Sequence, residues 1–126
     1  MSGARILIIE DDLLIVMDLQ TTLEGLGHQV VGTISRGEEA CQTIEETLAE
    51  VALMDIRLAG PLDGISTAKL IQSRFDIPVV FLTAVADVKK GSGPTGRWPV
   101  VNKPFREEEL QLAIEMALGE HKAGKR

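Results

Sequence analysis

The feature that most constrains the fold is a series of five short apolar runs spread along the chain. Within each run the apolar residues are nearly continuous instead of alternating with polar ones, which is typical of strands covered on both faces, as in a parallel sheet. Segments with helical spacing of apolar residues lie between the runs. We therefore predict an α/β fold with a doubly wound, five-stranded parallel sheet sandwiched by helices. The expected strands are residues 6–9, 30–34, 51–54, 79–82 and 99–101.

Four intervals between and after these strands predict helices, at residues 13–26, 36–48, 65–75 and 110–118. Ser35 followed by Glu38 fits a capping box that opens the second helix. Gly25-Leu26-Gly27 is expected to end the first helix, and Gly119 the last. The interval 84–98 is different, because its glycines and proline do not sustain a helix. At most one turn is expected there, near 86–90, so the fourth helix of the fold is short or absent.

Length and composition limit the classes of protein that remain. With 126 residues the chain is expected to form a single domain, with a core at about 4–119 and a solvated tail at 120–126. A net charge of −6 argues against direct nucleic-acid binding, which needs a basic surface. The sequence has no apolar run long enough to span a membrane. Its one cysteine, Cys41, has no partner for an internal disulfide, which suits a reducing cytoplasm.

Residues that carry chemistry follow the predicted strands, where ligands bind in open parallel sheets. Glu10, Asp11 and Asp12 follow the first strand, and Asp55 ends the third. Thr83 follows the fourth strand, and Lys103 with Pro104 follows the fifth. We expect these side chains to meet at one edge of the sheet, except Asp12, which is expected to cap the first helix.

Carboxylates brought together in one pocket repel one another, so they either raise a pKa or bind a cation. Oxygen ligands without His or Cys suit a hard ion, most simply Mg²⁺. Lys103 supplies the opposite charge, and Thr83 a hydroxyl. A metal, a cation and an in-line nucleophile are the requirements of phosphoryl transfer, with a carboxylate as the nucleophile here.

Taken together, five segments closely resemble the signature segments of response-regulator receiver domains of two-component signalling, from about residue 5 to 118. They are Glu10-Asp11-Asp12 with its preceding strand, Met54-Asp55-Ile56-Arg57, Leu62-Asp63-Gly64, Leu82-Thr83-Ala84 and Asn102-Lys103-Pro104-Phe105. The resemblance implies a flavodoxin-like (CheY-like) fold. It also implies that Asp55 accepts phosphate from a phosphohistidine on a sensor histidine kinase or a histidine phosphotransfer protein.

The same resemblance implies roles for the other site residues. Mg²⁺ would be held by Glu10, Asp11, Asp55 and the backbone carbonyl of Arg57, while Thr83 and Lys103 would bind the aspartyl phosphate. The protein would then be no enzyme in the usual sense, since it would catalyse only its own phosphorylation and dephosphorylation. It would act by switching its contacts with an unknown downstream protein, with no output domain in this chain.

Several features depart from the usual receiver pattern. The loop after Asp55 is one residue longer than common, with Pro61 where most members carry proline two places earlier, at Ala59 here. Val100 stands where most members carry Tyr or Phe, and the fourth helix is eroded. The segment from Pro99-Val100 to Lys103-Pro104-Phe105 and the weak fourth helix resemble a subgroup of stand-alone receivers that serve HWE-type and related sensor kinases. With no aromatic ring to move, we expect ordering of the segment 84–98 to signal phosphorylation.

Three rival readings remain. A nucleotide- or flavin-binding module would need a glycine-rich loop after the first strand, where Glu10-Asp11-Asp12 stands. A metal-dependent phosphatase would need a second acid two residues after its nucleophile, and Arg57 occupies that position. A receiver fold that only binds partners, without phosphorylation, usually lacks an acid, the Thr or the Lys, and all of these are present.

Overall fold

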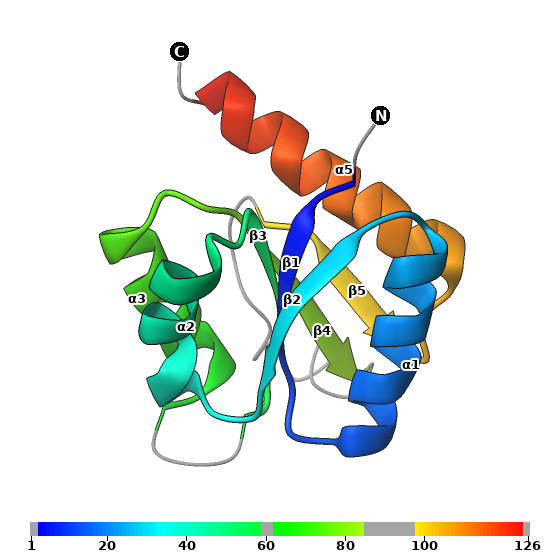
Figure 1. Ribbon diagram of the computed structural model, residues 1–126, viewed down its shortest axis with the longest axis horizontal. Helices are drawn as coiled ribbons and strands as arrows, with labels where there is room; N and C mark the ends of the chain where they lie inside the picture. The colour runs from blue at the N-terminus through cyan, green and yellow to red at the C-terminus, as the bar shows by residue number, and fades with distance from the viewer. Residues whose placement is uncertain (1–2, 59–61, 85–97, 125–126) are drawn as a thin grey trace.

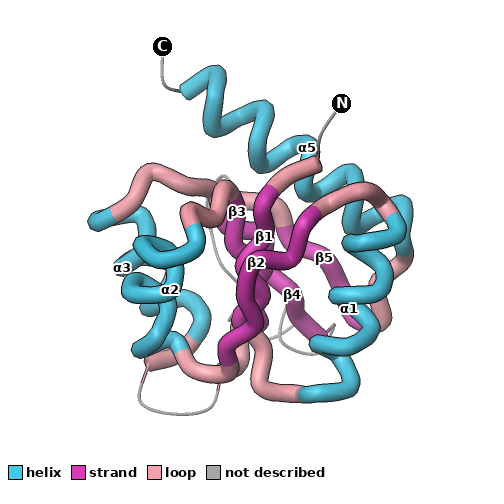
Figure 2. Tube along the Cα trace, in the orientation of Figure 1, coloured by secondary structure: helices cyan, strands magenta, loops and turns pink. Residues whose placement is uncertain are grey.

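The protein is described by a computed structural model that covers residues 3–58, 62–84 and 98–124. Five parallel strands form one sheet in the order β2-β1-β3-β4-β5, as Figures 1 and 2 show. The strands are β1 (Arg5–Ile9), β2 (Gln29–Ile34), β3 (Val51–Asp55), β4 (Val79–Ala84) and β5 (Val100–Lys103). The predicted doubly wound α/β fold is confirmed.

Helices cover both faces of the sheet (Figure 1). On one face lie α1 (Leu13–Gly25) and α5 (Glu107–Gly124). On the other lie α2 (Ala40–Thr47), which follows the 3₁₀ turn η1 (Gly37–Glu39), and α3 (Gly64–Arg74). Among the described residues, no helix has the length and hydropathy that crossing a membrane would need.

The apolar runs of the central strands are buried on both faces, because alternate residues serve the two layers. Ile6 and Ile8 belong to the core under α1 and α5, whereas Leu7 and Ile9 belong to the core under α2 and α3. All four are fully buried. At roughly 25 cal/mol per Å² of buried apolar surface, this central strand contributes strongly to the free energy of unfolding. The buried strands hold the carboxyl edge of the sheet in place.

The helix termini confirm some predictions and correct others. Asp12 caps α1 as expected, its carboxylate accepting from the Leu14 N–H at 3.0 Å and the Ile15 N–H at 3.4 Å. The capping box predicted at Ser35 is wrong. The chain is still extended at Arg36 (φ −132°, ψ 140°), and the turn that begins at Gly37 has no side-chain cap.

The fifth strand and the last helix also differ in their bounds. β5 begins one residue later than predicted and continues to Lys103, because its edge position lets polar Asn102 and Lys103 pair with Thr83 and Ala84. Gly119 does not end the last helix, since it lacks the left-handed conformation seen at Gly27 (φ 93°). α5 therefore continues to Gly124. The predictions for the segment 84–98 lie mostly outside the described residues.

Candidate functional site

The carboxyl edge of the sheet brings three predicted acids into one cluster. β1 and β3 are neighbours with Ile9 paired to Met54, so Glu10 and Asp55 leave the sheet side by side. One carboxylate oxygen from each of Glu10, Asp11 and Asp55 lies within 4.8 Å of the others. Asp11 is exposed, whereas Glu10 is 2% and Asp55 7% exposed. We call these three residues the acidic cluster.

Glu10 is the most buried member of the acidic cluster. Its Oε2 accepts from the Asp12 N–H at 3.0 Å, and its Oε1 accepts from Lys103 Nζ at 3.2 Å. Burial is the main cause that raises the pKa of Glu10 from 4.5 to about 7, and repulsion from Asp55 adds to it. The Asp12 N–H and the Lys103 ammonium oppose this rise without cancelling it.

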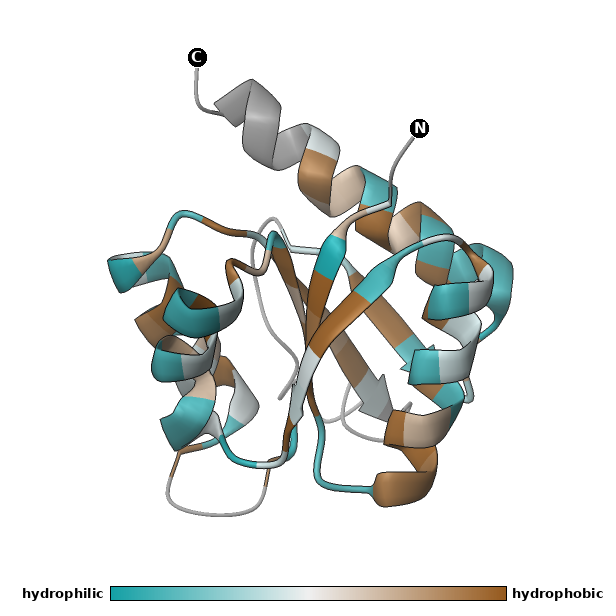
Figure 3. Ribbon diagram, in the orientation of Figure 1, coloured by the Kyte–Doolittle hydropathy of each residue, from teal (hydrophilic) through white to brown (hydrophobic). Residues whose placement is uncertain are grey.

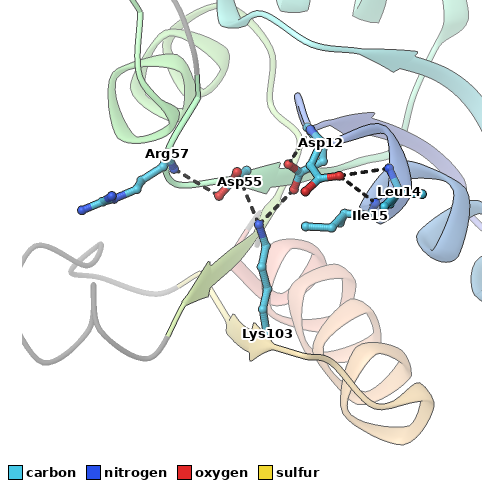
Figure 4. Close-up of polar contacts among 7 residues, drawn as sticks. Asp12, Leu14, Ile15, Asp55, Arg57 and Lys103 are labelled. Atoms are coloured by element: carbon cyan, nitrogen blue, oxygen red, sulfur yellow. Dashed lines mark hydrogen bonds and ion pairs between the residues drawn. The ribbon is translucent and has the colours of Figure 1, made fainter.

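Lys103 lies at the end of β5 and points toward the acidic cluster (Figure 4). Its Nζ lies 3.2 Å from Glu10 Oε1 and 3.4 Å from Asp55 Oδ2. Burial alone would lower the pKa of Lys103, but the charges of Asp55 and Glu10 outweigh burial and raise this pKa above 10.5. The ammonium is therefore charged at neutral pH. The Lys103–Pro104 peptide bond that follows is cis.

Asp55 ends β3 with each of its carboxylate oxygens in a different contact. Oδ1 accepts from the Arg57 N–H at 3.1 Å, and Oδ2 faces Lys103. The Arg57 side chain points away from the cluster, as Figure 4 shows. The backbone N–H groups of Asp12 and Arg57 were not foreseen as partners of the acids. The sequence carries no signal for them, because any residue except proline supplies an N–H.

Thr83 is fully buried near the end of β4. It follows Leu82, which is paired with Asp55, and is itself paired with Asn102, the residue before Lys103. The ladder thus places Thr83 at the same edge as Asp55 and Lys103. All the predicted site residues lie at this edge: Glu10, Asp11, Asp55, Arg57, Thr83 and Lys103.

The donor set fits a divalent hard cation. The acidic cluster offers carboxylate oxygens from three residues, without thiolate or imidazole in the group. Such oxygen ligands suit Mg²⁺, which keeps several waters and binds through one or two carboxylates. Asp11 is exposed, so an ion can reach the cluster from solvent.

Two cavities differ in their distance from the acidic cluster. One cavity of about 790 Å³ is lined by Leu48, Phe75 and Leu118 among others, at the opposite edge of the sheet. It contains no member of the acidic cluster. A smaller cavity of about 320 Å³ borders the site itself, between α1 and the start of the chain after β5. Its lining is Ile15, Asp18, Lys103, Pro104 and Phe105.

Comparison with known proteins agrees with the geometry. The family model described as the response regulator receiver domain matches residues 6–115. The chain is 35% identical to the phyllosphere-induced regulator PhyR of Methylorubrum extorquens over 92% of this chain and 44% of that protein. It is also 35% identical to the transcriptional regulatory protein PdtaR of Mycobacterium tuberculosis, over 90% of this chain and 56% of that protein. The chain thus spans about half the length of these curated relatives.

Solved structures of response regulators and receiver domains also superpose on this chain. The response regulator PhyR from Brucella abortus superposes with a TM-score of 0.84 at 33% identity, covering 98% of this chain and 51% of that one. The signal receiver domain of a modulated diguanylate cyclase from Desulfovibrio desulfuricans also gives a TM-score of 0.84, at 32% identity. It covers 98% of this chain and 99% of that one.

Proposed function

Because this chain belongs to the response regulator receiver domain family, we propose that Asp55 accepts a phosphoryl group from a phosphohistidine. The donor would be a sensor histidine kinase or a histidine phosphotransfer protein. The observation that carries the proposal is the contact of Asp55 Oδ2 with Lys103 Nζ at 3.4 Å, beside the acidic cluster. A nucleophilic carboxylate, a cation-binding cluster and a fixed ammonium meet at one point, which is what phosphoryl transfer requires.

In the proposed reaction a carboxylate oxygen of Asp55 attacks phosphorus, and the bond from phosphorus to the donor imidazole breaks. The imidazole leaves with the electron pair, so no proton has to be removed from Asp55. Lys103 stays protonated, because the pKa of its ammonium is raised, and it offsets charge on the phosphoryl oxygens. The buried hydroxyl of Thr83 supplies a further hydrogen bond at the same edge.

Mg²⁺ would be held by Glu10, Asp11, Asp55 and the Arg57 carbonyl, and when bound it would neutralise charge on the phosphoryl oxygens. The proton that Glu10 holds near neutral pH must leave before this residue acts as a ligand.

The surface beside the site suits docking of a phosphodonor protein. Three apolar residues in the first turns of α1 are exposed: Leu13 (70%), Leu14 (77%) and Met17 (57%). Figure 3 shows this first turn of α1 as hydrophobic. The 320 Å³ cavity lined by Pro104 and Phe105 adjoins the same helix through Ile15. We call Leu13, Leu14 and Met17 the α1 patch, and propose that a histidine-bearing protein docks on it.

In this proposal the protein is a cytoplasmic signalling component, and its only catalysis concerns its own aspartyl phosphate. Phosphorylation would change its contacts with a downstream protein. One solved PhyR, from Bartonella quintana, is described as an anti-anti-sigma factor, which means that this relative acts on other proteins.

Incubation with acetyl phosphate and Mg²⁺ tests the proposal, because a small donor does not require the kinase. We expect one added phosphoryl group per chain that is labile to hydroxylamine, and no labelling of Asp55→Asn. Absence of labelling in the parent would favour a receiver fold that only binds partners. Labelling of the variant at another residue would show that the acceptor is wrong.

A further inference from the structure

The 3₁₀ turn η1 packs against the first turn of α3 at a contact that only a glycine allows. A Cβ on Gly37 would collide with the Thr67 hydroxyl and lie 3.1 Å from the Leu62 carbonyl oxygen. Gly37 and Thr67 are both buried, Thr67 completely. The turn and the helix are therefore held in a single relative position, since closely packed interiors give little room for adjustment.

Thr67 also contacts the residue before α3 through hydrogen bonds. Its hydroxyl donates to the Asp63 carbonyl at 2.7 Å, and its N–H donates to the same oxygen at 2.9 Å. The Asp63 carboxylate in turn accepts from the Ser66 N–H at 2.8 Å and caps the helix. The start of α3 is thus fixed by three hydrogen bonds next to the Gly37 contact.

The start of α3 lies directly against the backbone of the proposed phosphoacceptor. A Cβ on Gly64 would collide with the Asp55 carbonyl oxygen and lie 2.7 Å from Ile56 Cα. The Gly64 N–H donates to the Ile56 carbonyl at 3.0 Å. Two residues after Asp55, the Arg57 N–H donates a hydrogen bond to Asp55 Oδ1. The position of α3 therefore sets the position of the two peptide units that flank Ile56, Asp55–Ile56 and Ile56–Arg57.

From this continuous set of contacts we infer that Gly37, Thr67 and Gly64 are positioning residues for phosphoryl acceptance. They act through the Asp55–Arg57 backbone and do not touch the phosphoryl group. The inference rests on the proposed function, because it assigns a task to these residues in that reaction. It also makes the β2–α2 connection, which carries no member of the acidic cluster, part of what aligns Asp55. Misplacing a reacting group by about 1 Å costs roughly a hundredfold in rate.

The test uses Gly37→Ala, with Gly25→Ala as the matched control, because a Cβ on Gly25 has no atom within 4 Å. Rates of phosphorylation by acetyl phosphate are measured at saturating Mg²⁺, at a temperature where circular dichroism shows each variant folded. We expect Gly37→Ala to be slower by about tenfold or more, and the control to stay within about twofold of the parent. Amide resonances of Asp55, Ile56 and Arg57 should shift in Gly37→Ala and stay in place in the control.

Thr67 provides a second arm that does not depend on Gly37→Ala being folded. Thr67→Ala loses the hydrogen bond from the hydroxyl to the Asp63 carbonyl and should slow phosphorylation, whereas Thr67→Ser keeps the hydroxyl and should restore the parent rate. Gly37→Ala should slow phosphorylation less in the Thr67→Ala background than in the parent, because the collision with the hydroxyl is gone and only the 3.1 Å approaches to the Leu62 carbonyl oxygen and Thr67 Cβ remain.

Parent-like rates and unshifted Asp55–Arg57 resonances in Gly37→Ala or Thr67→Ala would overturn the inference. A lower melting temperature with an unchanged rate would do the same, since that result assigns these residues to stability alone. If the parent itself is not labelled at Asp55, the proposed function fails instead, and the two failures are thereby distinguished.

Discussion

Lys103 and Glu10 form an ion pair across the edge of the sheet, with Nζ 3.2 Å from Oε1, although only 1% of the Glu10 side chain is exposed. The same ammonium lies 3.4 Å from Asp55 Oδ2, so one cation is shared between two carboxylates. A shared cation cannot neutralise both acids. Burial, with repulsion from Asp55, therefore still raises the pKa of Glu10 although the ammonium opposes it, while Lys103 remains charged. This arrangement leaves the acidic cluster in need of a further cation.

Replacing this ammonium should separate chemistry from folding. We expect Lys103→Gln to lower the rate of Asp55 phosphorylation by acetyl phosphate by about tenfold to a thousandfold, because a charged donor to the phosphoryl oxygens is lost. Lys69→Gln is the matched control, since Lys69 is exposed on α3. Rates at saturating Mg²⁺ are the measurement. A parent-like rate in Lys103→Gln would show that Lys103 serves only the ion pair.

The raised pKa of Glu10 predicts how stability depends on pH in the metal-free protein. Glu10 titrates at about 7 when folded and at 4.5 without its environment. Between these values the folded state binds a proton that the unfolded state does not, so stability should rise as pH falls from about 7 toward 4.5. Relative to Glu10→Gln, the parent should gain about 2 kcal/mol over that range.

Urea unfolding in EDTA at several pH values, for the parent and for Glu10→Gln, measures this difference. Other carboxylates titrate in both proteins, so only the difference between the two curves reports on Glu10. Parallel curves, or a parent that loses stability relative to the variant on acidification, would contradict the raised pKa.

The sequence predicted the convergence of Glu10, Asp55, Thr83 and Lys103 because parallel strands end at one edge, whatever their separation along the chain. It did not predict that a 3₁₀ turn begins at Gly37 and that α2 begins only at Ala40, because a local capping pattern says nothing of the contact with Thr67 on another helix. The predicted end of the last helix at Gly119 was wrong for a related reason. Glycine permits a helix to end, but the conformation of the residue decides whether it does. Long-range packing and backbone partners were thus the part that local patterns did not contain.

Two adjacent acids, Asp11 and Asp12, should behave in opposite ways. Asp11 belongs to the acidic cluster, so Asp11→Ala should abolish stabilisation by millimolar Mg²⁺ while the metal-free protein is at least as stable as the parent. Asp12 caps α1, so Asp12→Ala should cost about 1 kcal/mol in stability and keep the response to Mg²⁺. Thermal melts with and without Mg²⁺ measure both effects. A parent melt that does not respond to Mg²⁺ would count against the metal site.

The last prediction concerns the α1 patch. Val16, within the same turns of α1, is only 8% exposed, whereas Leu13, Leu14 and Met17 are exposed. Exposed apolar side chains on three neighbouring positions contribute little to folding, so a charge there should leave the fold intact. We expect Leu14→Glu to slow phosphotransfer from the cognate histidine kinase by about tenfold, because a carboxylate is desolvated at the docking surface.

Leu48→Glu is the matched control for Leu14→Glu. Leu48 is 68% exposed, close to the 77% of Leu14, but it lies at the opposite edge of the sheet and outside a regular helix. Profiling the parent against the histidine kinases of its host identifies the donor, and both variants are then compared with that kinase and with acetyl phosphate. Leu14→Glu should be slow only with the kinase, since acetyl phosphate reaches Asp55 without docking. Equal loss with both donors would place the damage in the site itself, and equal loss in Leu48→Glu would mean that charge anywhere on the surface is enough to weaken transfer.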